Sequence, residues 1–133
     1  MKVFLDTSAV YAVLDSDDAN HQRAREQWAS LVDSEANTLV TTNYVLVECS
    51  ALIQHRLGFE AVRGFQEDML GLVNIHWIDS ETHRAAVSAF LAASRRKLSL
   101  VDCVSFEVMR TLGIKLAFAF DSHFKEQGFT CMP

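Results

Sequence analysis

Four carboxylates lie in apolar stretches of the chain, where an ionised side chain is unfavourable. Asp6 and Asp121 each follow a run of β-favouring apolar residues, the position at which a buried strand of a parallel sheet would end. Glu48 is the only charged residue in an apolar helical stretch, and Asp102 shares a helical stripe with Phe106. A lone buried carboxylate is destabilising by several kcal/mol unless it is protonated, paired or bound to a metal ion. These four acids are therefore the first candidates for chemistry.

Three of the four acids also have a structural explanation. Asp6 and Asp121 could each cap the helix that follows. Asp102 stands three residues after Ser99, which is the spacing of a capping box if Ser99 is the N-cap. Glu48 falls more than one turn into its helix, so capping does not explain it. Because basic partners are scarce, we expect the four acids to share a divalent cation, and hard oxygen ligands suit Mg²⁺ or Mn²⁺.

Strand and helix patterns alternate along the chain, which indicates a parallel sheet between layers of helices. Asn43 is expected to cap the helix that begins at Tyr44, and Gly58 is expected to end it. The predicted strands cover residues 3–5, 38–42, 73–78, 115–120 and 129–131, and the predicted helices cover residues 7–14, 20–34, 44–57, 59–72, 80–97 and 101–112. We expect residues 1–133 to form a single α/β domain.

Composition narrows the possible classes of protein. Half of the residues are hydrophobic, which excludes a disordered chain, and no apolar run is long enough to span a bilayer. The N-terminus lacks the features of a signal peptide, so we expect a cytoplasmic protein with no membrane partner. A net charge of −5 argues against a general nucleic-acid binder. It does not exclude a nuclease, because a bound metal ion reverses the local field of clustered carboxylates.

Four blocks of the sequence resemble the PIN-domain ribonucleases, and specifically the VapC-like toxins of bacterial toxin–antitoxin pairs. The blocks are Phe4-Leu5-Asp6-Thr7-Ser8-Ala9, Glu48 within its apolar helix, residues 98–106 around Asp102, and residues 119–124 around Asp121. A single Asp-Thr-Ser segment is weak evidence, but four blocks in this order within one short domain are specific. The resemblance covers the whole length of the chain.

The resemblance implies a PIN-like α/β/α fold of three layers, with a central, mostly parallel sheet of four or five strands and the first strand in the middle. It also places four residues on the acidic, metal-binding and catalytic positions of the family: Asp6, Glu48, Asp102 and Asp121. The implied cofactor is Mg²⁺, with Mn²⁺ as an alternative. The implied function is a metal-dependent ribonuclease that acts as the toxin of a toxin–antitoxin pair.

Small polar residues beside the first acid are further candidates for the site. Ser8 falls on the small polar position of the family, and we expect Ser8 and Thr7 to orient the acids while also starting a helix. The chain departs from its relatives at Ala119, where Thr or Ser often stands two residues before the last acid. The missing hydroxyl is expected to weaken metal binding at Asp121.

The predicted mechanism is in-line attack on RNA by a metal-activated water, which leaves 5′-phosphate and 3′-hydroxyl ends. Asp6 and Asp102 are the expected direct ligands, while Glu48 and Asp121 either bind the metal or hold the attacking water. The resemblance further implies a homodimer and a small cognate antitoxin protein that blocks the acidic site. The alternative is a catalytically weak or silent PIN-like module that binds RNA or antitoxin, which Ala119 favours and the four intact acids oppose.

Contacts with the substrate are less well defined by the sequence. The only basic run is Arg95-Arg96-Lys97, which could bind RNA phosphates or stabilise the C-terminus of the preceding helix. His123 follows the last acid and could donate a proton, although packing in a loop is the favoured interpretation.

Overall fold

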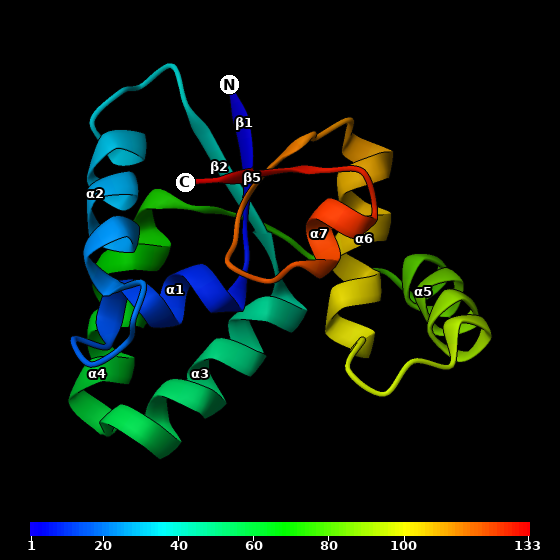
Figure 1. Cartoon of the computed structure of the whole chain (residues 1–133), viewed down its shortest axis with the longest axis horizontal. Coiled ribbons are helices and arrows are strands. Elements are labelled where there is room, and N and C mark those ends of the chain that lie inside the picture. The colour runs from blue at the N-terminus through cyan, green and yellow to red at the C-terminus, as the bar shows by residue number, and fades with distance from the viewer.

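The computed structural model describes residues 1–133 and is built around a five-stranded sheet (Figure 1). The strand order is β3-β2-β1-β4-β5, and every neighbouring pair is parallel. The strands are β1 (Lys2–Leu5), β2 (Thr38–Thr42), β3 (Asn74–His76), β4 (Leu116–Phe118) and β5 (Thr130–Met132). Because β1 is central and all strands run the same way, their carboxyl ends meet at one edge of the sheet.

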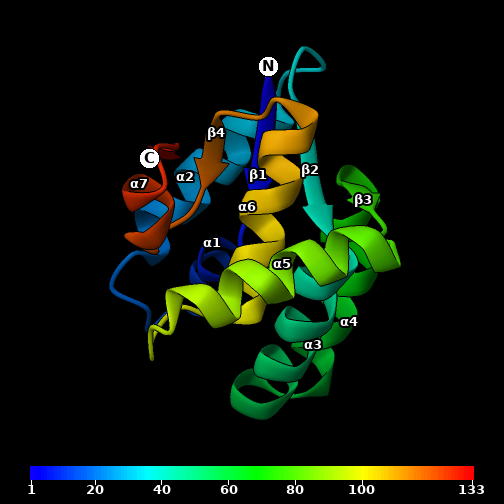
Figure 2. The ribbon, with the colours of Figure 1, turned by 90° about the vertical axis from the view of Figure 1, so that its right-hand side faces the viewer.

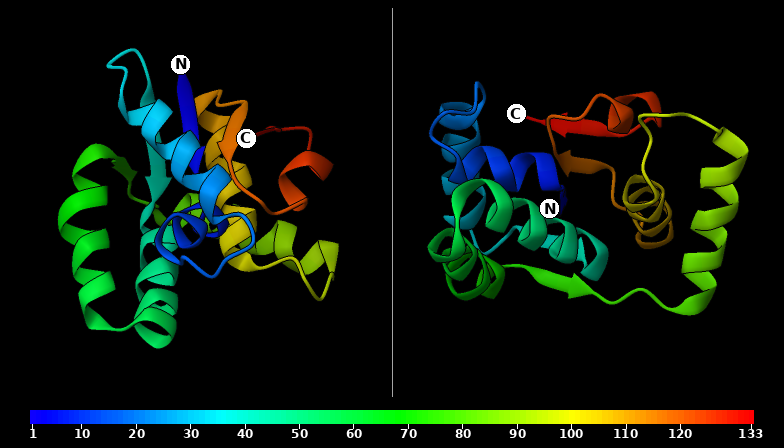
Figure 3. Two further views of the ribbon diagram at one scale, coloured as in Figure 1. Left: turned by 60° about the vertical axis from the view of Figure 1, so that its left-hand side comes forward. Right: turned by 90° about the horizontal axis from the view of Figure 1, so that it is seen from below.

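Helices cover both faces of this sheet, which gives the expected three-layer α/β/α fold. Figure 2 shows α6 in front of β1, α5 crossing in front of the lower part of α6, and α1 and α2 behind the sheet. The helical elements are α1 (Thr7–Leu14), α2 (His21–Val32), α3 (Asn43–Leu57), α4 (Phe59–Gly64), a π-helical turn (Phe65–Met69), a 3₁₀ turn (Leu70–Leu72), α5 (Ser80–Ala93), α6 (Leu100–Leu112) and α7 (His123–Glu126). The α4 helix packs beside α3, and α5 packs against α6 (Figure 3). No helix has the length and apolar character that crossing a bilayer requires.

The core explains why the first strand is an unbroken apolar run. Val3, Phe4 and Leu5 are fully or almost fully buried because helices cover both sides of β1. Phe4 and Phe124 bring their ring centroids to 6.3 Å, which joins the central strand to α7. This contact holds β1 against α7, and Asp6 directly follows β1.

Two sequence-based predictions about helix ends are wrong. Thr42, rather than Asn43, caps α3, because its side chain accepts a hydrogen bond from the backbone N–H of Val45. Asn43 instead accepts a hydrogen bond from the N–H of Ile78, which ties the start of α3 to the segment after β3. The helix predicted to reach residue 97 ends at Ala93, because the next residue adopts the left-handed conformation, with φ of 50°.

Two predicted elements are also interrupted or shorter. The helix expected over residues 59–72 is α4 followed by a π-helical turn and a 3₁₀ turn, and the π turn buries Phe65 and Met69. The strand expected over residues 115–120 pairs only over β4, after which the N–H of Ala119 donates to the carbonyl of Met132 at 3.3 Å. Asp121 therefore lies in the turn before α7 and does not end the strand directly.

Candidate active site

The four predicted acids come together at the carboxyl edge of the sheet, although they derive from four different elements. Asp6 follows β1 and Asp121 follows β4, and these two strands are paired neighbours. Glu48 projects from the second turn of α3, and Asp102 from the first turn of α6. The four acids are close enough to affect one another, since the charges of Asp102 and Asp121 raise the pKa values of Asp6 and Glu48.

Asp6 is buried and is held in a fixed orientation by Ser8. Its Oδ2 accepts hydrogen bonds from the Ser8 N–H at 3.1 Å and from the Ser8 hydroxyl at 2.6 Å, so Asp6 is also the N-cap of α1. Asp6 can therefore cap α1 and also belong to the acidic site, because its second carboxylate oxygen accepts no hydrogen bond from the chain. The same hydroxyl of Ser8 accepts a hydrogen bond from the N–H of Phe120 at 2.9 Å.

Glu48 is anchored by Thr7, whose hydroxyl donates to Glu48 Oε1 at 2.5 Å. Thr7 is buried in the first turn of α1, so this bond fixes the α3 carboxylate relative to the helix that Asp6 caps. The two hydroxyls at the start of α1 therefore orient two different acids, Ser8 acting on Asp6 and Thr7 on Glu48.

Asp102 forms the predicted capping box with Ser99. The Asp102 carboxylate accepts from the Ser99 N–H at 3.1 Å, and the Ser99 hydroxyl accepts from the Asp102 N–H at 3.0 Å. Only Asp102 Oδ2 is used in this bond, which leaves Oδ1 without a hydrogen bond from the chain. The capping interpretation and the site interpretation of Asp102 are therefore compatible.

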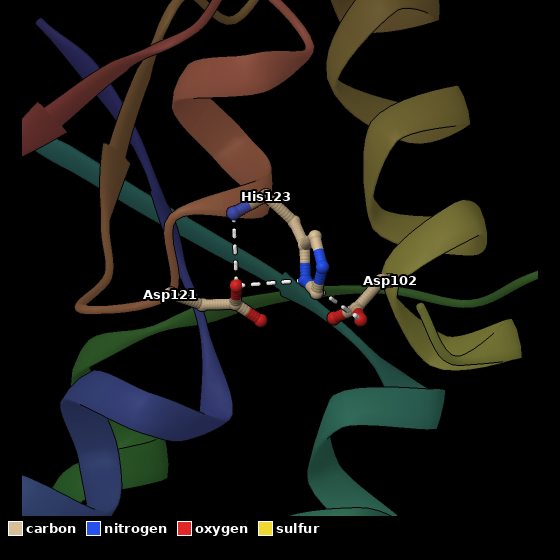
Figure 4. A group of neighbouring side chains, drawn as sticks. All are labelled: Asp102, Asp121 and His123. Atoms are coloured by element: carbon tan, nitrogen blue, oxygen red, sulfur yellow. Dashed lines mark hydrogen bonds and ion pairs between the residues drawn. The ribbon is translucent and has the colours of Figure 1, made fainter. Parts of the chain in front are cut away.

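His123 completes a tight group with Asp102 and Asp121 (Figure 4). One ligand atom from each of the three residues lies within 4.8 Å of the other two. The imidazole Nδ1 lies 2.9 Å from Asp121 Oδ1 and 4.0 Å from Asp102 Oδ2. The 2.9 Å approach is poorly aligned, so this buried nitrogen makes no hydrogen bond. Packing in a loop was the favoured sequence interpretation of His123, yet its ring faces the acids.

Three of the acids are held in surroundings that disfavour their ionised forms. Burial raises the pKa of Asp6 to about 7, although the hydrogen bonds from Ser8 act in the opposite direction. Burial also raises the pKa values of Glu48 and Asp102, and the charge of Asp121 raises them further. Since no Arg or Lys side chain forms an ion pair with any of the four acids, the site favours a cation that binds to them.

The donor set fits a divalent cation. Four carboxylates converge, Asp6 and Asp102 each have one oxygen free of hydrogen bonds, and the buried His123 nitrogen has no partner. A cation at this position would offset the repulsion between the acids. It would also give the unpartnered Nδ1 of His123 a metal ion to coordinate. Oxygen-rich sites of this kind suit Mg²⁺ and Mn²⁺. The tight triad leaves out Asp6, one of the two residues expected to be direct ligands, and includes Asp121 and His123 instead.

The basic run Arg95-Arg96-Lys97 lies outside the last turn of α5 and directly follows its C-cap, Ser94. Arg95 forms an ion pair with Glu126 of α7 at 2.9 Å, which holds the loop after α5 against the end of the chain that carries His123. Arg96 and Lys97 are exposed in the same loop.

Comparison with known proteins defines the class. The PIN domain family matches residues 3–129, and the chain belongs to this family. The chain is 33% identical over 128 residues to the 23S rRNA-specific endonuclease VapC20 of Mycobacterium tuberculosis, a match that covers 96% of this chain and 95% of the relative. The predicted resemblance to VapC-like PIN-domain ribonuclease toxins is thereby confirmed.

Solved structures agree with this assignment. The crystal structure of M. tuberculosis VapC20, described as a sarcin-ricin loop cleaving toxin, matches with a TM-score of 0.85 and 31% identity, covering 96% of both chains. FitAcB from Neisseria gonorrhoeae matches with a TM-score of 0.71 at 11% identity, covering 98% of this chain and 96% of that one. VapBC2 from Rickettsia felis, bound to a DNA fragment, matches with a TM-score of 0.72 at 12% identity, covering 98% and 97%. The last two likenesses concern the fold alone.

Proposed function

We propose that residues 1–133 form a single PIN domain that acts as a divalent-metal-dependent endoribonuclease. The observation that carries this proposal is the convergence of Asp6, Glu48, Asp102 and Asp121 at one edge of the sheet, where burial and mutual repulsion raise the pKa values of the first three. Four acids that converge without basic partners are stable as a group when a cation neutralises them. The same cation would attract an RNA phosphate.

The chain positions its acids through fixed hydrogen bonds rather than through flexible side chains. Ser8 fixes Asp6, Thr7 fixes Glu48 and Ser99 fixes Asp102, each at the first turn of a helix or directly before it. Preorganised groups of this kind act on a reacting phosphate without having to rearrange during the reaction. Asp102 and Asp121 would hold the cation, with Asp6 and Glu48 binding it directly or through water.

A bound Mg²⁺ or Mn²⁺ would lower the pKa of water and neutralise the phosphoryl oxygens. The carboxylates of Asp6 and Glu48 would accept a proton from a water at the site, a role for which their raised pKa values in the metal-free chain suit them. The ring of His123 lies beside Asp121 and Asp102, and it could donate a proton to a leaving oxygen bound there. The expected products carry 5′-phosphate and 3′-hydroxyl ends.

We also propose that the substrate is a structured loop of 23S ribosomal RNA. The support is the 33% identity, over 96% of this chain, to a relative described as a 23S rRNA-specific endonuclease. By the same resemblance, we propose that a small antitoxin protein binds over the acidic site, and that the chain forms a homodimer. An antitoxin Arg or Lys that reached the carboxylates would form a strong charge-assisted contact.

The test is cleavage of purified ribosomes and of free 23S rRNA by the wild-type chain, with Mn²⁺ or Mg²⁺ and with EDTA. We expect metal-dependent cuts that map to a single loop and leave 5′-phosphates. Asp102→Asn should abolish cleavage and weaken calorimetric Mn²⁺ binding. Asp79→Asn, which alters an N-cap outside the site, should change neither.

Two results would refute parts of this proposal. Cleavage that persists in Asp102→Asn would remove the acid cluster from the mechanism. Intact RNA in the presence of metal that binds normally would favour the alternative, a silent module that binds RNA or antitoxin.

A further inference from the structure

A polar pocket opens directly beside the acidic site, and Asp121 belongs to its lining. It has a volume of about 270 Å³, and its lining includes Asn20, Arg23, Asp121 and Lys125. These residues come from the loop before α2, from α2 itself, from the turn after β4 and from α7. The pocket is therefore assembled by segments about a hundred positions apart in the sequence, and Asp121 belongs to both the pocket and the acid cluster.

The two cations of this pocket have no carboxylate partner. The ion pairs of the structure involve Arg63, Arg95 and His123, and neither Arg23 nor Lys125 takes part in any of them. Both side chains are exposed, and neither donates a hydrogen bond to another side chain. In a chain with a net charge of −5, two unpaired cations in one pocket form a local field opposite to that of the whole protein.

Arg23 is nevertheless held in place. Its guanidinium lies over the ring of Phe120, with 5.6 Å between its central carbon and the ring centroid. Stacking of this kind orients the planar group and leaves its N–H donors available for a second partner. The N–H of Phe120 is in turn bound to the hydroxyl of Ser8, which fixes Asp6. Arg23 is thus linked to the carboxylate of Asp6 through Phe120 and Ser8.

We propose that this pocket is a phosphate subsite, in which Arg23 and Lys125 bind a backbone phosphate of RNA next to the one that is cleaved. This inference rests on the proposed ribonuclease function. A phosphate next to the scissile one must lie beside the acid cluster, and the pocket shares Asp121 with that cluster. Guanidinium and ammonium groups are the side chains that most often contact phosphate oxygens in nucleic-acid complexes.

The assignment also changes which basic residues are expected to touch RNA. Arg95, the first residue of the only basic run, is already neutralised by Glu126. Arg23 and Lys125 form no ion pair, and they share their pocket with Asp121, one of the four acids. We therefore assign the main contact to Arg23 and Lys125 and a lesser one to Arg96 and Lys97.

The direct test is the affinity of a fluorescein-labelled oligouridylate for the full chain in EDTA, measured by anisotropy at several salt concentrations. The test variant is the double substitution Arg23→Gln with Lys125→Gln. Its matched control is Arg25→Gln with Lys115→Gln, which removes the same charge from exposed positions outside the pocket. The slope of log affinity against log salt changes by roughly 0.7 for each phosphate contact to single-stranded nucleic acid.

We expect the pocket variant to bind RNA roughly tenfold more weakly and to lower the salt slope by about 1 to 1.5, while the control stays near wild type. Thermal melting confirms that both variants are folded. In the Mn²⁺-dependent cleavage assay, the pocket variant should raise KM and leave kcat close to wild type, because the subsite holds RNA without touching the reacting atoms.

Equal losses in the pocket variant and the control would overturn the subsite, since general charge would then explain both. An oligoglutamate peptide of similar charge is titrated in parallel, and loss of peptide binding with unchanged RNA binding would overturn it in favour of an acidic protein partner. Weakened RNA binding by the pocket variant, together with no cleavage by the wild type under any metal, would retain the subsite and refute the nuclease function.

Discussion

Replacing Asp6 by Asn should make the metal-free protein more stable while removing its ability to use metal. The Asp6 carboxylate is buried, and its pKa is raised to about 7 from an ordinary value of 3.8. The folded chain therefore holds the proton more tightly than the unfolded chain does. The associated stability is fully present below the ordinary pKa and is lost as the pH rises through about 7.

The size of the effect follows from the pKa difference. About three pKa units correspond to ~4 kcal/mol at pH 8, since each unit is worth about 1.4 kcal/mol. Hydration and relaxation around the charge reduce this value, so we expect Asp6→Asn to gain about 2 kcal/mol in EDTA at pH 8. The amide oxygen of Asn can still accept the two hydrogen bonds from Ser8. For a domain of this length the gain corresponds to a Tm increase of ~8 °C.

The assay is thermal unfolding of both proteins across a pH series, first in EDTA and then with Mn²⁺. The advantage of Asp6→Asn should shrink to about a third at pH 5, where wild-type Asp6 is protonated in the folded state. Added Mn²⁺ should stabilise the wild type and leave Asp6→Asn almost unchanged, because a ligand that binds only the folded state raises its stability.

Asp79→Asn provides the matched control. Asp79 is also a helix N-cap, but hydrogen bonds from Thr82 lower its pKa, so its carboxylate stabilises the fold above that pKa and ceases to do so as the pH falls. We expect Asp79→Asn to be slightly less stable than wild type at pH 8. The reasoning would be refuted if Asp6→Asn were no more stable than wild type in EDTA at pH 8, or if its advantage did not depend on pH.

Three further substitutions test individual contacts. Ser8→Ala should lower stability by about 1–2 kcal/mol in urea unfolding and raise the pKa of Asp6 further in carboxylate NMR titrations, because hydrogen bonds from Ser8 lower that pKa; an unchanged titration would argue against this link. His123→Ala should weaken calorimetric Mn²⁺ binding roughly tenfold, and unchanged affinity would show that His123 takes no part in the site around Asp121. Ala119→Ser should tighten Mn²⁺ binding several-fold by supplying the hydroxyl that the family resemblance predicts at this position, whereas weaker binding would show that this buried position has no room for it.

Much of the fold could be predicted because buried elements have strong sequence patterns. An unbroken apolar run predicts a central parallel strand, and β1 is the middle strand of the sheet. The four acids could be selected because each stands among apolar residues, and the structure brings them to one edge. The ends of elements were harder to predict. The α5 helix ends where Ser94 takes a left-handed conformation, which no periodic pattern encodes.

Parts of the site that depend on long-range contacts could not be read from the sequence. His123 is an isolated histidine two residues after Asp121, and its ring is brought toward Asp102 by the turn before α7. Arg23 and Lys125 belong to different helices, about a hundred positions apart, and the fold places both at one pocket beside the turn that carries Asp121. A run of consecutive basic residues is easy to recognise in a sequence. Cations that are far apart in the sequence and meet only in the folded chain are not.

The hydrogen bond from Phe120 to Ser8 joins residues 112 positions apart. The sheet also joins the beginning of the chain to its end. The central strand β1 is synthesised first, and β4, one of its two neighbours, is made near the end of the chain. A ribosome that has translated the first hundred residues therefore carries Asp6 and Glu48 but neither Asp121 nor the strand that precedes it. The order of synthesis therefore leaves the acidic site incomplete in the growing chain until Asp121 has been added. The site is complete only when the segment around Phe120 and Asp121 has folded against the segment around Asp6 and Ser8.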